Sequence, residues 1–396
     1  MIKFSNITKK STLIKALSVL VIFSFTECKK GCTDPLATNY NPNAKKEDQS
    51  CEYENFDKKA LLENLTNTYI LPSLDAYKNS VESLDLAANT FSSSPNTTNL
   101  NILRNSWVNS LLNWQDVSML DFGPAEYIVL KSQTNTYPSD TNLINQNITN
   151  GTWTFASATF NDQKGYQALD FLLNRPGHND QQLVDYFLST SNSTNYLTDI
   201  IQDLVVNMTY VHTEWNSSYK VNFINDFESN AQGSSVSNIV NALNLHYEYY
   251  LRRGKIGLPL GVFNGFSQQE MPELVECYYY GQSLPFAIRA VESLQNFING
   301  SNYDFPEENN SGLDNYMDFI GAQHSGTNLS TVINNKLNEI VLNLNGLNDP
   351  LSNEVITNKT AVSNAYTKLQ ELVPLLKVDM TSALGVLITY QDNDGD

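Results

Sequence analysis

An amide and a carboxylate stand three positions apart in the apolar run from Gly165 to Leu173, at Gln167 and Asp170. Residues three apart share one face of a helix, so these two side chains would project together while the leucines pack. A carboxylate directed into a packed bundle costs free energy unless it is paired, hydrogen-bonded or bound to a metal. The pair therefore predicts either a site for a hard cation such as Ca²⁺ or Mg²⁺, or a hydrogen-bonded contact between helices.

Other candidate ligand residues stand beside apolar stripes elsewhere in the chain. The planar guanidinium of Arg104, in Arg-x-x-Trp107, could clamp Asp170 or an anionic ligand, and it could equally be a surface group beside a core tryptophan. Lys255 is either a cation that faces a ligand or part of a loop that caps a helix. Glu292 would supply a second carboxylate if its helix faced Asp170. All four residues are candidates for the same ligand or metal site.

The chain ends in alternating acids, Asp392, Asp394 and Asp396. This spacing resembles half of a calcium loop, but the bidentate glutamate that would complete the loop does not follow. The acids are therefore weak metal candidates, and a solvated acidic tail is the alternative.

Peptidase motifs are absent from the sequence. It contains neither His-Glu-x-x-His nor Gly-x-Ser-x-Gly, and its four histidines are scattered. Cys277 has no histidine or other base within a few positions, so we interpret it as a buried packing residue rather than a nucleophile. The sequence therefore gives no support for proteolysis.

The composition limits the partners. The formal net charge is −18 and the sequence pI is about 4.6, which argues against nucleic-acid binding because that requires a basic face. An acidic surface attracts cations, although it also serves simply to keep a protein solvated. Hydrophobic residues make up 41% of the chain, enough for a sizeable core.

The N-terminus has the features of an export signal over residues 1–27. Lysines precede a short apolar stretch from Leu17 to Phe25, and Cys28 follows directly. This pattern predicts a lipoprotein whose Cys28 carries the lipid anchor, attached to the outer membrane on its periplasmic or outer face. Glu27 departs from the small residue usual before the lipidated cysteine, so an ordinary secretory signal is the alternative.

Residues 28–54 predict a short spacer. Cys32 and Cys51 bracket a segment rich in Asp, Asn, Pro and Gly, which are turn-forming residues. We expect the two cysteines to form a disulfide, because the cell envelope is oxidising. The bracketed segment is either a spacer or a small ligand site.

Helical spacing dominates residues 55–396. Apolar residues recur at helical intervals at Leu103, Trp107, Leu111 and Trp114, and similar stripes follow to the end of the chain. A loop-rich insertion is expected from Asp121 to about Asp162. A helix over 234–253 is expected to end at a glycine-rich loop over 254–261. We predict an all-α fold of two antiparallel bundles with a junction near 254–270.

These segments together resemble the imelysin family of iron-regulated bacterial envelope proteins. The family has Gly-x-His-x-x-Glu where this chain has Gly165, Gln167 and Asp170, so both polar positions differ from the family pattern. The other matching segments, in the family's order, are Arg104-x-x-Trp107, Gly123-Pro124, Tyr137-Pro138, Lys255-x-Gly257-x-Pro259, Glu292-Ser293-Leu294 and the acidic terminus. The resemblance implies two helical bundles and a role in acquiring iron or another metal.

The leading hypothesis is an exported, lipid-anchored envelope protein. It would bind a metal, such as iron or another divalent cation, or a small ligand between the bundles, and it would work with an outer-membrane transporter. Because some family members are labelled peptidases, a metallopeptidase with ligands from distant positions is one alternative. A scaffold without catalytic activity, presented to an outer-membrane partner, is the other.

Overall fold

The computed structural model describes residues 29–35, 37–52, 54–302 and 311–390. These residues form two compact units, one ending at Asn55 and the other beginning at Phe56. The predicted signal peptide, Cys28 and the terminal acids Asp392, Asp394 and Asp396 lie outside the described residues. Within the described ranges, no helix combines the length and apolar character needed to cross a membrane.

The first unit is built from turns and is closed by a disulfide. Cys32 and Cys51 are bonded at an S–S distance of 2.05 Å, which confirms the expected pairing. Inside the bracket, the Glu47 carboxylate accepts hydrogen bonds from the backbone N–H and the hydroxyl of Thr33, both at 2.8 Å. A disulfide and local polar contacts therefore hold a segment too short to bury a core.

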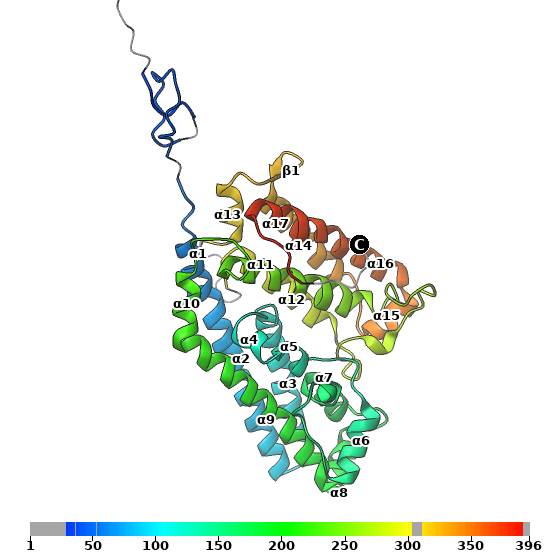
Figure 1. The fold of residues 1–396 in the computed structure, drawn as a ribbon. Helices are drawn as coiled ribbons and strands as arrows, with labels where there is room; N and C mark the ends of the chain where they lie inside the picture. Colours follow the sequence, from blue (N-terminus) through cyan, green and yellow to red (C-terminus); the bar gives the residue numbers. More distant parts are fainter. Residues whose placement is uncertain (1–28, 36, 53, 303–310, 391–396) are drawn as a thin grey trace, which may run out of the picture. The chain divides into compact units, whose positions relative to one another are not determined.

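The second unit is all-α, with two antiparallel helical bundles, as the spacing predicted (Figure 1). In the first bundle, α2, α3 and α9 pack together and α7 packs against α3 and α9. The elements of this half are α1 (Lys58–Asn64), the π-helical η1 (Leu65–Ile70), α2 (Leu71–Ser93), α3 (Thr97–Val117), α4 (Pro124–Tyr127), α5 (Leu130–Thr134), α6 (Thr141–Asn150), the 3₁₀ turn η2 (Ala158–Gln163), α7 (Gly165–Leu173), α8 (Asp180–Ser189), α9 (Ser191–Glu214), the π-helical η3 (Trp215–Tyr219) and α10 (Lys220–Asn225).

The second bundle packs α12, α14 and α16 side by side, with η4 against α12 and α16. Its elements are α11 (Ser235–Leu245), the π-helical η4 (His246–Gly257), the 3₁₀ turn η5 (Pro272–Leu274), α12 (Leu284–Ile298), α13 (Leu313–Phe319), the hairpin strands β1 (Gln323–His324) and β2 (Thr327–Asn328), α14 (Leu329–Asn345), α15 (Leu351–Thr357), α16 (Lys359–Pro374), the π-helical η6 (Leu375–Met380) and α17 (Thr381–Leu384). Helix α12 also packs on α3 and so joins the two bundles.

Helix α3 shows how local sequence sets an element and its buried face. Asn96 caps its first turn, because the Asn96 side chain accepts a hydrogen bond from the backbone N–H of Asn99 at 2.9 Å. The stripe predicted from Leu103 to Trp114 is buried along its whole length. Helical spacing alone therefore identified the face of α3 that enters the core.

Two expectations about loops differ from the structure. The insertion from Asp121 to Asp162 contains three short helices, α4 to α6, and the turn η2. The helix expected to stop before Gly254 instead continues as η4 to Gly257. A π-helix has i→i+5 hydrogen bonds and a wider turn than an α-helix, so residues four and five apart lie above one another. His246, Tyr250 and Lys255 consequently share one face of η4.

Candidate functional site

The helix that carries the predicted pair, α7, is buried over all nine residues. It starts at Gly165, whose φ of +72° belongs to the left-handed region. A Cβ at this position would lie 2.2 Å from the backbone oxygen of Thr134. Only glycine therefore allows the chain to enter α7 so close to the end of α5.

Gln167 and Asp170 both hold the backbone of the segment 275–281, an arrangement that we call the α7 clasp. The Gln167 side-chain oxygen accepts a hydrogen bond from the Cys277 N–H at 2.8 Å. The Asp170 carboxylate accepts hydrogen bonds from the N–H groups of Tyr279 at 2.9 Å and Tyr280 at 2.8 Å. The side chains project together as predicted, and their partner is an irregular segment rather than a helix.

A chain of hydrogen bonds connects the clasp to Lys255. The Gln167 amide donates to the Asn135 side-chain oxygen at 2.8 Å, and the Asn135 amide donates to the Glu276 carboxylate at 2.7 Å. Glu276 in turn forms an ion pair with Lys255, and both side chains are almost completely buried. Asn135, Glu276 and Lys255 thus come from other segments of the chain and are connected to Gln167 in the folded structure.

Arg104 and Trp107 support α7 from α3. The Arg104 guanidinium donates to the Leu173 carbonyl at 2.8 Å, at the C-terminal end of α7, and to the Asp180 carboxylate at 2.7 Å. The Trp107 indole N–H donates to the Tyr166 carbonyl at 3.2 Å. The contacts with Leu173 and Tyr166 are with the backbone of α7, so Arg104 and Trp107 position the helix that carries the clasp.

Glu292 lies in a different cluster, on α12. It is half-buried, and burial raises its pKa. Its neighbour Arg289 forms a two-pronged ion pair with Asp116 of α3, at 2.7 and 2.6 Å. This pair joins α3 to α12. A pocket of about 190 Å³ adjoins the α7 clasp, and Glu292 is not among the residues that line it.

Sequence reasoning missed two members of this chain of hydrogen bonds, Asn135 and Glu276. Glu276 had a usable signal, because an acid between Val275 and Cys277 is a charge in an apolar setting, like Asp170. Asn135 had no such signal, since asparagine is common in this chain and usually marks a turn.

The pocket that adjoins the clasp has a volume of about 190 Å³. Gln167 and Asp170 reach it from α7, and most of the rest of its wall comes from two loop segments. Its lining consists of Tyr137, Pro138, Ser139, Gln167, Asp170, Glu273, Val275, Tyr278 and Tyr279. The pocket combines carboxyl groups, phenols and a hydroxyl with few apolar side chains, so a ligand there would be held mainly by hydrogen bonds.

Burial raises the pKa of Asp170 to about 7, against the opposing effect of the hydrogen bonds that it accepts from Tyr279, Asn174 and Tyr280. The folded protein therefore keeps a proton at pH values where the unfolded chain has lost it. Stability contributed by this group is present below about pH 4 and is lost as the pH rises towards 7.

We expect the stability of the wild type, relative to Asp170→Asn, to fall between pH 4 and pH 7 by on the order of 3 kcal/mol. The asparagine side chain does not titrate, so the variant lacks this pH dependence, and the contact of its NH2 group with an N–H donor of the clasp lowers its stability by an amount that does not vary with pH. Urea unfolding of both proteins at several pH values measures the difference. Parallel curves over this range would show that Asp170 titrates normally.

The clasp residues do not suit a bare iron ion. The oxygens of Gln167 and Asp170 already accept N–H groups, and a metal bound there would have to displace the segment 275–281. Among the described residues, the one group of three potential His, Cys, Asp or Glu ligands is Cys32, Glu47 and Cys51, whose sulfurs form the disulfide. Hard-oxygen ligation at the clasp is therefore not available without rearrangement.

The known proteins that this chain resembles include one family and the solved structures of two bacterial proteins. The model of the family described as Imelysin matches residues 70–376. A proposed iron-regulated protein A precursor from Parabacteroides distasonis has a TM-score of 0.67 at 16% identity, covering 83% of this chain and 95% of its own. An imelysin-like protein from Psychrobacter arcticum has a TM-score of 0.63 at 16% identity, covering 84% of this chain and 97% of its own. No curated protein matches the chain.

Proposed function

Because this chain belongs to the imelysin family, we propose that it is an exported, lipid-anchored envelope protein that binds a small polar ligand beside the α7 clasp. The observation that carries the proposal is the pocket of about 190 Å³ that Gln167 and Asp170 line. The iron-regulated description of the Parabacteroides relative supports a role in iron acquisition. The basic and apolar N-terminus followed by Cys28 supports export and anchoring.

The chemistry of the pocket suits a molecule rather than an ion. Asp170 and Glu273 supply carboxyl groups, while Ser139 and Tyr278 can both donate and accept hydrogen bonds. Such a lining orients a polar molecule through several hydrogen bonds. Any iron that this protein carries would therefore arrive inside a small chelate, whose own atoms ligate the metal.

The proposed mode of action is binding and delivery without catalysis. The anchor at Cys28 would hold the protein at the outer membrane, where a transporter is the partner that fits a binding protein. A scaffold without a ligand is the second candidate, and the hydrogen bonds that saturate Gln167 and Asp170 favour it.

Filling the pocket should abolish ligand binding. We expect the full chain, purified in detergent, to bind ferrioxamine B, a cationic iron chelate, with one-to-one stoichiometry in calorimetric titrations. Ser139→Trp should weaken this binding by about tenfold or more, because the indole would occupy the pocket. Elemental analysis after exposure to Fe²⁺ alone should show no stoichiometric metal.

Ser83→Trp, at an exposed position on α2, is the matched control and should bind ferrioxamine B like the wild type. If Ser139→Trp bound the chelate as tightly as the wild type does, the ligand would not bind in this pocket. If the wild type bound Fe²⁺ stoichiometrically and Asp170→Asn did not, the ligand would be a bare iron ion rather than a chelate. Absence of binding to either probe would favour the scaffold.

A further inference from the structure

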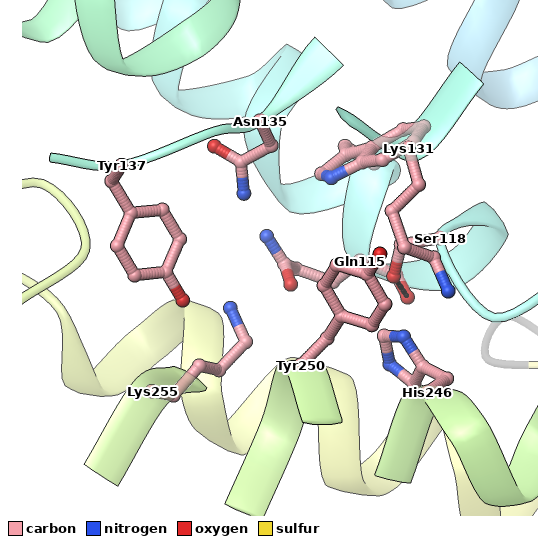
Figure 2. Close-up of a pocket in the computed structure, with 9 residues that line it drawn as sticks. Gln115, Ser118, Lys131, Asn135, Tyr137, His246, Tyr250 and Lys255 are labelled. Carbon is pink, nitrogen blue, oxygen red and sulfur yellow. Dashed lines mark hydrogen bonds between the residues drawn. The ribbon is translucent and has the colours of Figure 1, made fainter. Parts of the chain in front are cut away.

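A second cavity, of about 20 Å³, lies where α3 and the end of α5 face η4 (Figure 2). In Figure 2 the side chains of His246, Tyr250 and Lys255 rise from η4 toward residues of the opposite wall. The cavity is lined by Trp114, Gln115, Ser118, Lys131, Asn135, Tyr137, His246, Tyr250 and Lys255. Tyr137 also lines the pocket at the clasp, and it is the only lining residue that the two have in common.

Two buried polar groups at this cavity have no hydrogen-bond partner. His246 is 2% exposed, and neither of its ring nitrogens is hydrogen-bonded. The Lys131 ammonium is also without a hydrogen bond, although it lies 3.4 Å from the Asp121 carboxylate and 4.2 Å from the centre of the Tyr250 ring. Buried groups left in this state cost about 1–3 kcal/mol each, so native proteins normally supply them with a partner.

The charges around the cavity favour an acceptor of hydrogen bonds. Lys131 and Lys255 line it, and none of its nine lining residues is an acid. The carboxylates that balance these lysines, on Asp121 and Glu276, are not part of the lining. A cation inside would face two ammonium groups, whereas an anion would face two ammonium groups and several N–H or O–H donors.

His246 adds a neutral donor. Burial lowers the pKa of His246 well below its usual value, and the charges of Lys131 and Lys255 lower it further. The imidazole is therefore uncharged, with one N–H that can donate into the cavity. The donors that face the cavity are thus the neutral His246 ring and the two ammonium groups, whose carboxylate partners lie outside the lining.

We propose that this cavity binds a single monatomic anion of the halide class, such as chloride. A volume of this size accepts one water molecule or one small ion, but not a polyatomic ligand. The anion would accept hydrogen bonds from the Lys131 ammonium on α5 and the His246 ring on η4, and it would tie these two elements together across the two bundles. This site is separate from the ligand pocket and does not depend on the proposed function.

Bromide provides a direct test, because it replaces chloride and is located by its anomalous scattering. We expect crystals of the full chain grown in sodium bromide to show one anomalous peak within hydrogen-bond distance of the Lys131 ammonium. A peak at that position, which disappears in Lys131→Met, would establish the site. Density without anomalous signal would show that the cavity holds water and would overturn the proposal.

Thermal unfolding gives a second readout in solution. At constant ionic strength, replacing sodium gluconate with sodium chloride should raise the Tm of the wild type by about 2–4 °C, because the anion binds only the folded protein. Lys131→Met should lose this rise, and Lys359→Met, which removes an exposed ammonium, should keep it. If Lys131→Met does not fold, the presence or absence of the bromide peak in wild-type crystals decides whether the anion site exists. Identical Tm values in both salts would contradict the proposal.

Discussion

Gly165→Ala is expected to destabilise the protein by about 3–5 kcal/mol. The backbone at Gly165 has a φ of +72°, and a Cβ there would lie 2.2 Å from the Thr134 carbonyl oxygen. The variant therefore combines an unfavourable left-handed conformation with a collision against backbone, which cannot rotate away as a side chain can. Chemical denaturation, monitored by circular dichroism, measures the loss.

Gly177→Ala is the matched control for this prediction. Gly177 has a similar φ of +78°, but a Cβ there would meet nothing within 4 Å. Its loss should be only about 1–2 kcal/mol, the cost of the left-handed conformation by itself. Equal losses in the two variants would mean that α5 and α7 can separate at no cost.

Lys255→Met is expected to cost a similar amount, about 3–5 kcal/mol. The Lys255 and Glu276 side chains are only 6% and 2% exposed, so removing the ammonium leaves a carboxylate buried without its counter-charge. Glu276 also accepts a hydrogen bond from the Asn135 amide, but a neutral amide does not replace the lost positive charge. The clasp should loosen as well, because Asn135 connects it to this ion pair.

Two further variants separate burial from charge. Lys359→Met breaks the ion pair with Glu270, in which the lysine is 47% exposed, and should cost no more than about 1 kcal/mol. The double variant Lys255→Met with Glu276→Leu should recover much of the loss, because no buried charge then remains. A double variant as unstable as the single one would show that packing, rather than the unpaired carboxylate, causes the loss.

The helical bundles were predictable because their signal is local. The stripe from Leu103 to Trp114 repeats at helical intervals, and burying it is favourable against almost any neighbouring apolar surface. The role of Asp170 was predictable in part. A carboxylate in an apolar helix needs a partner, and hydrogen bonds within the protein were one of the two expected solutions.

The partners of Asp170 were not predictable. Tyr279 and Tyr280 lie about 110 residues further along the chain, and they bind Asp170 through backbone N–H groups that every residue type except proline carries. The sequence offered Glu292 as a second carboxylate near Asp170, but the carboxylate that is connected to the clasp is that of Glu276. The apolar neighbours of Glu276 mark it as a charge that needs a partner, but they do not say that it reaches α7, because that depends on which loop packs against this helix.

The sequence by itself determined the class of the fold, the buried stripes of its helices and the need for a partner at Asp170, since each follows from neighbouring residues. The tertiary structure alone decided which residues meet. In an α-helix, Lys255 would turn away from His246 and Tyr250, and the π-helical winding of η4 places all three on one face. The face of η4 that these residues leave packs against α12 and α16, and such contacts between distant segments leave no periodic mark in the sequence.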